Sequence, residues 1–220
     1  MPYTSISKHI SNRTGAFRPH DLIRVAQVSD LQSHGDLPVW ARPCLMRAPF
    51  VVVRRAPAPT PDVIPVGIRG RTRGERAPAF LTVSAVLETI TPEQLVQMKI
   101  HQMRDIPAFR TLRCVSTALI EAGYSWGPTG SIAFELASGI HTATTESDLD
   151  LIIRAPVPLC DSAAGNLFRF LSSFTVHVDV QLDTPVGVIA LAEYVQRKMP
   201  VLARTTYGEF MVRDPWAMRF

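Results

Sequence analysis

The sequence predicts an α+β fold, in which a small β-rich N-terminal domain is followed by a domain of helices and strands around a mixed sheet. Two observations lead to this prediction. Up to about residue 88 the chain consists of β-branched and aromatic runs separated by Pro and Gly, whereas capped helical segments alternate with apolar strands beyond it. The 220 residues are enough for one large domain or two small ones. We place the domains at residues 1–88 and 89–220.

Three strands are expected in the first domain, over residues 51–54, 63–68 and 80–86. Each is a run of β-branched or aromatic residues, and Pro57-Ala58-Pro59-Thr60-Pro61 and the glycines at 70 and 74 separate them. The loop over 69–76 carries four arginines. The first domain is therefore expected to present an arginine-rich loop between two of its strands.

In the second domain Thr91 and Gln94 form a capping box around Pro92, which starts a helix. Gly123 and Gly139 are expected to end two later helices. Residues 126–131 are expected to form a turn that leads into either a short helix or a strand through Ala137, and Gly139 favours the helix. Thr184 and Pro185 are expected to cap and open a further helix. The expected elements are helices over 92–103, 107–122, 131–137, 163–173 and 185–197, strands over 149–153 and 175–182, and a closing hairpin from 201–203 and 210–212.

Composition excludes several classes of protein. Hydrophobic residues make up 46% and charged residues 19%, which excludes a disordered chain or a polar nucleic-acid-binding tail. No apolar run approaches the roughly 18 residues that a membrane span needs, and the polar start lacks a signal peptide. Three dispersed cysteines form neither a disulfide framework nor a zinc motif and are expected to be packed thiols. We expect a cytoplasmic protein with no membrane or nucleic-acid partner.

Acidic residues on two predicted strands are the strongest chemical signal. Asp148 and Asp150 point to the same face, because side chains two residues apart in a strand do so. This pattern alone is weak, since a solvated strand also produces it. Asp179 lies in the middle of a second apolar strand, where an acid is costly unless it is paired or bound to metal. We expect the three carboxylates to hold magnesium, and we attribute the neighbouring Asp183 to capping.

These residues, together with the Gly130-Ser131 turn, resemble the polymerase-beta-like nucleotidyltransferase superfamily. In that superfamily a Gly-Ser turn holds a phosphate of the donor, and three acids, here Asp148, Asp150 and Asp179, hold two magnesium ions. The resemblance therefore implies a nucleotidyltransferase-like second domain with these acids as its catalytic residues. The stretch between Ser131 and Asp148 is longer than usual, which suggests an extra loop over 141–146.

A closer resemblance is to the malonate decarboxylase holo-acyl-carrier-protein synthases, which are phosphoribosyl-dephospho-CoA transferases. It spans residue 17 to the C-terminus. It implies transfer of phosphoribosyl-dephospho-CoA from triphosphoribosyl-dephospho-CoA to a serine of the apo acyl carrier subunit, with release of pyrophosphate. The motifs that carry it are Arg18-Pro19-His20-Asp21-Leu22, Pro65-Val66-Gly67-Ile68-Arg69-Gly70, Arg104-Asp105-Ile106-Pro107-Ala108, Trp126-Gly127-Pro128-Thr129-Gly130-Ser131, Phe134-Glu135-Leu136-Ala137 and Ser147-Asp148-Leu149-Asp150-Leu151.

Arginines supply the expected phosphate contacts. Arg69, Arg71 and Arg73 are the candidate donor ligands, because guanidinium groups suit polyphosphates; a solvated loop is the alternative. Of Arg54 and Arg55, strand alternation allows only one to point inward. Structural roles are expected for four other residues that could have touched a ligand: His20, His177, Trp126 and Trp216.

Two other functions stay open at this point. One is a transferase that moves AMP from ATP to a small molecule or protein, because the same acids serve either donor. The other is a carrier- or nucleic-acid-binding module without catalytic activity. The complete set of acids argues against a module, and the absence of aromatic residues among the arginines argues against binding of single-stranded nucleic acid.

Overall fold

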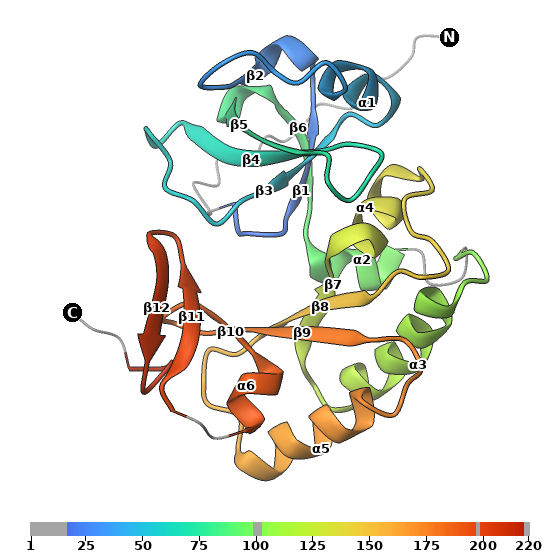
Figure 1. The fold of residues 1–220 in the computed structure, drawn as a ribbon, viewed down its shortest axis with the longest axis vertical. Helices are drawn as coiled ribbons and strands as arrows, with labels where there is room; N and C mark the ends of the chain where they lie inside the picture. Colours follow the sequence, from blue (N-terminus) through green and yellow to red (C-terminus); the bar gives the residue numbers. More distant parts are fainter. Residues whose placement is uncertain (1–16, 99–102, 197–198, 218–220) are drawn as a thin grey trace, which may run out of the picture.

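The chain forms two six-stranded sheets, one above the other in Figure 1. A computed structural model describes residues 17–98, 103–196 and 199–217. The chain contains both helices and strands, and the second sheet has parallel and antiparallel strand pairs. The predicted α+β class is therefore confirmed. The division into domains at residue 88 stays a prediction.

The first sheet has the strand order β2-β5-β4-β3-β1-β6, and its pairs in the described residues are all antiparallel. One face packs on helix α1, Ala41–Arg47, around buried residues such as Leu45, Val51 and Ile68. The strands are β1 Leu22–Val25, β2 Leu31–Gln32, β3 Phe50–Val53, β4 Val63–Arg69, β5 Arg76–Thr82 and β6 Val86–Ile90, with 3-10 turns at Val28–Asp30 and Val83–Ala85.

The second sheet has the order β12-β11-β10-β9-β8-β7, with β8 and β9 parallel. Helices α3, α5 and α6 lie on the side of this sheet that faces away from the first sheet, and α2 and α4 lie on the side toward it (Figure 1). The elements are α2 Pro92–Met98, α3 Pro107–Glu121, β7 Ser125–Pro128, α4 Gly130–Ser138, β8 Leu149–Arg154, α5 Asp161–Leu171, β9 Val178–Asp183, β10 Val188–Ala190, α6 Leu191–Val195, β11 Val201–Thr205 and β12 Gly208–Val212.

Strand alternation divides the side chains of β8 and β9 between the two faces of the sheet. Leu149, Leu151 and Ile153 are buried in the core with the helices, and so are Val180 and Leu182. Asp150 and Arg154 on β8, and Asp179, Gln181 and Asp183 on β9, take the alternate positions. A row of polar residues therefore lines the face of the second sheet that is turned toward the first.

The predicted helix ends that depend on local chemistry are confirmed. The backbone N–H of Thr91 donates to Gln94 Oε1 at 2.8 Å, and that of Gln94 donates to Thr91 Oγ1 at 3.3 Å, which is the predicted capping box. Gly123 and Gly139 follow α3 and α4 with φ of 73° and 71°, a backbone conformation that favours glycine. The expected end of the first helix falls on 99–103 and lies partly outside the described residues.

Three other predictions were wrong, and a fourth, the strand over 175–182, is confirmed with a later start. The run over 80–86 is divided by a 3-10 turn, because its two parts pair with different strands, β4 and β1. Half of the segment taken as a turn at 126–131 belongs to strand β7, and β9 begins only at Val178. Thr184 and Pro185 begin a tight turn, because Thr184 Oγ1 donates to the carbonyl of Gly187 at 2.6 Å. Strand β10 and the short α6 then replace the predicted helix over 185–197.

The helices and the cysteines can be compared with what the composition predicted. No helix within the described ranges is long and apolar enough to cross a lipid bilayer. The three cysteines are free, as expected, but Cys114 and Cys160 are exposed and are not the packed thiols that the sequence suggested.

Candidate active site

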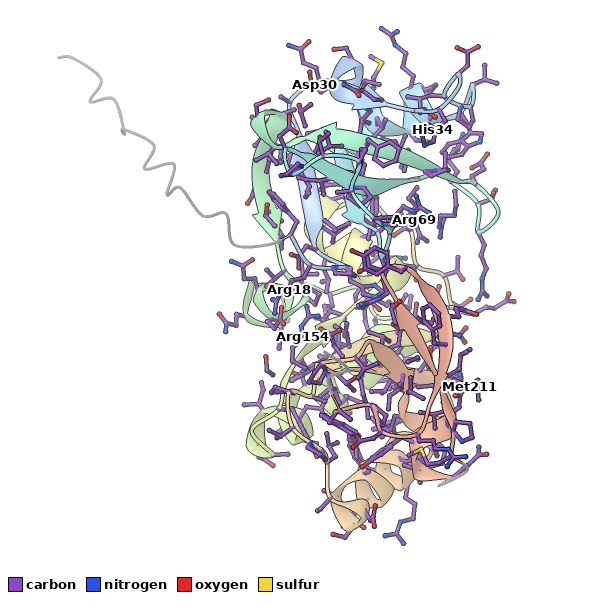
Figure 2. All side chains as sticks on the ribbon, turned by 90° about the vertical axis from the view of Figure 1, so that its left-hand side faces the viewer. Arg18, Asp30, His34, Arg69, Arg154 and Met211 are labelled. Carbon is purple, nitrogen blue, oxygen red and sulfur yellow. The ribbon has the colours of Figure 1, made fainter. Side chains whose placement is uncertain are left out.

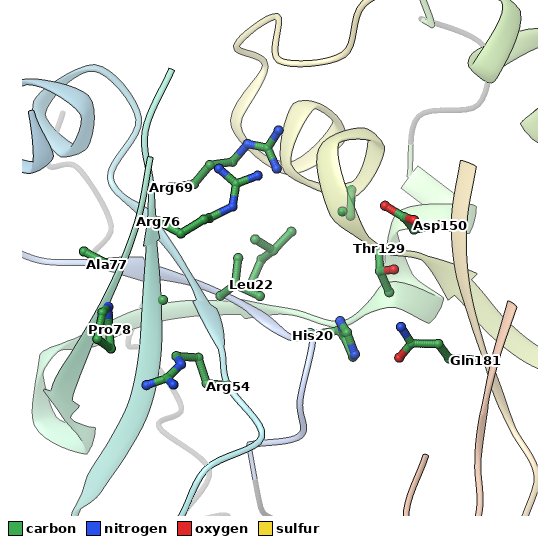
Figure 3. A pocket seen from close by; sticks show the side chains of 14 residues that line it. His20, Leu22, Arg54, Arg69, Arg76, Ala77, Pro78, Thr129, Asp150 and Gln181 are labelled. Atoms are coloured by element: carbon green, nitrogen blue, oxygen red, sulfur yellow. The ribbon is translucent and has the colours of Figure 1, made fainter. Parts of the chain in front are cut away.

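A cavity of about 490 Å³ lies between the two sheets, and side chains from both sheets line it (Figure 3). The first sheet contributes Arg69 and Arg76, and the second contributes Asp150, which lies across the cavity from them. The remaining lining residues are His20, Leu22, Val52, Arg54, Gly67, Ala77, Pro78, Thr129, Gly130, Ala133 and Gln181. The cavity thus brings together basic and acidic groups that lie far apart in the sequence.

The predicted acids meet at the start of β8 and β9. Asp150 is the direct neighbour of Asp179 in the parallel register, and Asp148 lies just before β8. Burial raises the pKa of Asp150, and the charges of Asp179 and Asp148 raise it further, while Arg73 and Arg69 oppose the shift. The acids therefore repel one another across a short distance, which favours a bound cation.

Magnesium fits these carboxylates if a bound phosphate supplies some of its ligands. Within the described part of the chain, no group of three His, Cys, Asp or Glu side chains is arranged to hold a metal ion by itself. Magnesium is usually bound by one or two carboxylates, with water and substrate phosphates completing its coordination. Asp150 and Asp179, with Asp148 beside them, suit a cation that is shared with a bound phosphate.

Gly130 begins helix α4 in direct contact with Asp150. Its φ is 62°, and a Cβ atom at this position would overlap Asp150 Oδ2. The backbone N–H of Thr129 donates to the carbonyl of Asp150 at 2.8 Å and fixes the start of the helix against β8. Ser131 follows in the first turn of this helix. Free N–H groups at a helix start attract phosphate, so the site places an anion-binding element next to the acids.

Arg69 and Arg76 form the positive side of the cavity (Figure 3). The guanidinium carbon of Arg69 lies 5.7 Å from the centre of the Phe134 ring, so this side chain connects the first sheet to helix α4. Burial and the charge of Arg76 lower the pKa of Arg69 to about 10, which leaves it protonated at neutral pH. Its Nε is buried without a hydrogen-bond partner in the described residues. An anionic ligand would supply the missing acceptor.

The other two predicted arginines do not line this cavity. Arg71 lines a neighbouring cavity of about 200 Å³, which Arg69 also lines. Arg73 is exposed and acts on Asp150 only through its charge. Their loop is ordered by Glu75, whose Oε2 accepts from the backbone N–H of Arg71 at 2.6 Å and of Thr72 at 2.9 Å. Arg76, which sequence reasoning counted in the loop but did not select, is the residue that reaches the cavity with Arg69.

Four further cavity residues were not selected from the sequence. His20 has φ of 76°, and burial, with Arg55 and Arg154 nearby, lowers its pKa to about 4. The side chain of Gln181 hydrogen-bonds to its ring. Thr129 was only part of a quoted motif, and Arg54 was left as one of two choices. The position of Gln181 on the same strand face as Asp179 was the one signal that could have identified it.

The structure also decides the roles of Asp183, of the two arginines after β3 and of the two tryptophans. Asp183 is not a capping residue, because Arg154 Nη1 donates to it at 2.8 Å and Arg55 Nη2 lies 3.6 Å from it. Alternation does not choose between Arg54 and Arg55, because β3 ends at Val53 and each of the two arginines lines a cavity. Structural roles fit both tryptophans, since Trp126 is buried in the core and the indole N–H of Trp216 donates to the carbonyl of Ala155 at 2.8 Å.

The loop over 141–146 is attached to α4 by a buried carboxylate. Glu135 accepts two hydrogen bonds from Arg104, at 2.6 and 2.8 Å, and two from the backbone N–H groups of Thr142 and Ala143, both at 2.9 Å. Thr142 Oγ1 also donates to the carbonyl of Ser131 at 2.9 Å. Two of the sequence motifs therefore meet in one network that supports the start of α4.

Comparison with known proteins gives two matching family models. Residues 18–92 match the phosphoribosyl-dephospho-CoA transferase MdcG N-terminal domain, and residues 94–215 match the corresponding C-terminal domain. Proteins named phosphoribosyl-dephospho-CoA transferase are similar over most of their length. One from Pseudomonas syringae pv. tomato is 40% identical over 90% of this chain and 92% of its own, and one from Pseudomonas putida is 37% identical over 91% and 96%. No solved structure matches the chain.

Proposed function

The chain belongs to the phosphoribosyl-dephospho-CoA transferase family, and on this basis we propose its donor, acceptor and catalytic residues. The donor is 2'-(5''-triphosphoribosyl)-3'-dephospho-CoA, and the acceptor is a serine of the malonate decarboxylase acyl carrier subunit. The serine Oγ forms a bond to the α-phosphorus of the donor, the bond from that phosphorus to the β-phosphate oxygen breaks, and pyrophosphate leaves.

In this proposal the triphosphate lies between the first sheet and the start of α4. Arg69 and Arg76 contact its β- and γ-phosphates, and the helix start at Gly130 and Ser131 provides backbone N–H donors. Arg71 and Arg73 attract the donor through their charge, since exposed cations near a cavity raise the local concentration of an anion. The observation that best supports this arrangement is that Arg69, Arg76, Gly130 and Asp150 line one cavity.

Asp148, Asp150 and Asp179 would hold magnesium against the donor. Such ions neutralise phosphate charge and stabilise the entering and leaving oxygens of an in-line displacement. Asp179 also takes up the proton of the serine hydroxyl. Asp150 is held by its strand and by the contact with Gly130, so its carboxylate has little freedom to turn away from the donor.

Intact-protein mass spectrometry tests the reaction. The protein is incubated with magnesium, the apo carrier subunit and either triphosphoribosyl-dephospho-CoA or ATP, and released pyrophosphate is assayed. We expect the carrier to gain one phosphoribosyl-dephospho-CoA group per pyrophosphate, and to lose this gain when its acceptor serine is replaced by alanine. An AMP-sized gain from ATP would favour the AMP-transferring alternative, and no modification of the carrier from either donor would contradict the proposal.

Asp150→Asn tests the catalytic assignment within this assay. Removing one of three repelling charges should leave the melting temperature of the metal-free protein unchanged or higher, while transfer falls by a factor of at least a thousand. Asp105→Asn is the matched control, because Asp105 is exposed at the start of α3 and outside the cavity. Activity of Asp150→Asn within tenfold of wild type would show that the carboxylate assignment is wrong.

A further inference from the structure

A second cavity, of about 590 Å³, adjoins the catalytic cavity, and His20 and Gln181 line both. Figure 3 shows the side chains of these two residues facing each other. The second cavity lies between the segment that follows β3 and the hairpin of β11 and β12. Its other lining residues are Arg55, Ala56, Pro57, Val188, Arg204, Thr205, Thr206, Gly208 and Glu209. His20 and Gln181 thus form the partition between two neighbouring spaces.

The second cavity has its own pair of arginines. Arg55 comes from the first half of the chain, and its Nη2 is buried without a hydrogen-bond partner in the described residues. Arg55 Nη2 lies 3.6 Å from Asp183 Oδ1, a distance that gives an ion pair but is too long for a hydrogen bond. Arg204 comes from β11, and its Nε donates to Glu209 Oε1 at 3.2 Å. A buried donor without an acceptor is costly in a folded protein, so an acceptor supplied by a ligand would explain Arg55.

His20, one of the two residues of this partition, has an unusual backbone conformation. His20 is a non-glycine residue with φ of 76°, and its backbone N–H donates to the carbonyl of Val53 at 3.0 Å. Residues other than glycine adopt such angles at a cost and mostly where the surrounding structure enforces it. The uncharged imidazole and the amide of Gln181 offer hydrogen-bond donors and acceptors without a charge. They suit the uncharged hydroxyl and base groups of a nucleoside.

We propose, on the basis of the proposed function, that the second cavity binds the diphosphate of the dephospho-CoA part of the donor, with Arg55 and Arg204 as its ligands. The donor carries two separate anionic groups, a triphosphate on the added ribose and a diphosphate on the adenosine. Two adjacent cavities, each with arginines, match these groups, and the adenosine and ribose lie between them at His20 and Gln181. A concave site with one guanidinium nitrogen, Arg55 Nη2, buried in its wall suits a small molecule better than a docking protein.

The proposal makes Arg55 and Arg204 specificity residues. ATP has a triphosphate but lacks the second diphosphate, so it would fill the catalytic cavity and leave the second cavity empty. The true donor engages both cavities, and binding energy from its distant diphosphate is available to hold the triphosphate in the reacting position.

Calorimetric titration with two separate probes tests the assignment. Dephospho-CoA carries the diphosphate without the triphosphate, and inorganic tripolyphosphate carries only the other group. We expect Arg204→Gln to weaken binding of dephospho-CoA at least tenfold and binding of tripolyphosphate less than twofold. Arg76→Gln should give the reverse pattern. Arg213→Gln, an exposed arginine just after the hairpin, removes the same charge outside both cavities and should change neither affinity more than twofold.

Arg55→Gln serves as a second variant, with its melting temperature measured first because it also loses the ion pair to Asp183. Unchanged dephospho-CoA affinity in both Arg204→Gln and Arg55→Gln would overturn the proposal. So would a raised KM for the carrier subunit with unchanged dephospho-CoA affinity, because the second cavity would then belong to the carrier. If wild type binds dephospho-CoA through Arg204 but does not modify the carrier, the proposed reaction fails and the binding site stands.

Discussion

His20 shows how a single residue can connect packing with chemistry. It is half-buried, it lies in the left-handed backbone region, and its ring meets Gln181 at the boundary between two cavities. With the pKa of His20 lowered to about 4 by burial and by the nearby arginines, the ring is uncharged at neutral pH. It can therefore lie beside Arg55 and Arg154 without repelling them.

This shift predicts a specific loss of stability in acid. In the unfolded chain His20 takes up a proton below pH 6.5, whereas in the folded protein it does so only near pH 4. Protons therefore favour the unfolded state between these values. Its contribution is fully present above pH 6.5 and decreases as the pH falls toward 4, by up to about 3 kcal/mol.

His20→Asn provides the comparison, because asparagine tolerates positive φ and does not titrate. Urea unfolding at several pH values between 7 and 4 should show the free energy of unfolding of wild type falling relative to that of the variant. The raised pKa values of Asp21 and Asp150 act in the opposite direction in both proteins and largely cancel. A constant difference across this range would show that the histidine is not held uncharged.

At the scale of elements, helix α2 and strand β7 approach so closely that only glycine fits between them. A Cβ atom on Gly127 would overlap the carbonyl group of Pro92 at the start of α2. This backbone cannot move without shifting the capping box at Thr91 and the position of Glu93, which pairs with Arg154. The glycine thus fixes how a helix in front of the second sheet lies on it.

Gly127→Ala should lower the free energy of unfolding by about 3 kcal/mol, because the added methyl group meets rigid backbone. Gly165→Ala is the matched control within α5, where the new Cβ meets nothing within 4 Å. That substitution should raise stability by up to about 1 kcal/mol, since alanine favours the helix. Thermal and urea unfolding measure both. Equal stability of the two variants would contradict the close packing of α2 on β7.

The elements that could be predicted from the sequence are those decided by local chemistry. The capping box at Thr91 and the glycines that end α3 and α4 act within a few residues, and all were predicted. Strand β10 could not be, because Thr184 and Pro185 give a local helix signal while pairing with β9 and β11 decides the outcome. Helix α1 also lacks a signal, since its N-cap residue, Trp40, makes no capping hydrogen bond.

The residues of the candidate site also fall into those that local patterns predicted and those that they did not. Alternation within β8 and β9 predicted that Asp150 and Asp179 share a face, and the structure makes them direct neighbours. The opposite side of the cavity is built by His20, Arg54 and Arg76, and their approach depends on how the first sheet packs on the second. No pattern within a strand or loop encodes that packing, so the partner groups of the acids could not be found from spacing alone.

At the scale of the whole molecule, the two sheets are joined by shared core and by shared charge. Leu22, Phe50 and Ile90 of the first sheet belong to the same apolar cluster as the helices and strands of the second half. Beside this cluster, Glu93 pairs with Arg18 at 3.2 Å and with Arg154 at 2.7 Å. Arg18 and Arg154 lie at the junction of the sheets in Figure 2. Since the cavity lies at this junction, its shape depends on both kinds of contact.

Arg154 is the centre of this charged network, because it also donates to Asp183 at 2.8 Å and its side chain is only 9% exposed. Arg154→Met should keep the length of the side chain but leave two half-buried carboxylates, Glu93 and Asp183, without their closest ion-pair partner, at a cost of about 3 kcal/mol in the free energy of unfolding. Arg110→Met is the matched control, because Arg110 forms an exposed pair with Asp105, and exposed pairs contribute less than about 1 kcal/mol.

Urea unfolding of both variants, followed by a titration with tripolyphosphate, separates the effect on stability from the effect on the cavity. Loss of stability together with weaker tripolyphosphate binding in Arg154→Met alone would show that the network maintains the cavity as well as the fold. Equal effects of the two substitutions would show that the apolar cluster alone holds the two sheets at the spacing that the site requires.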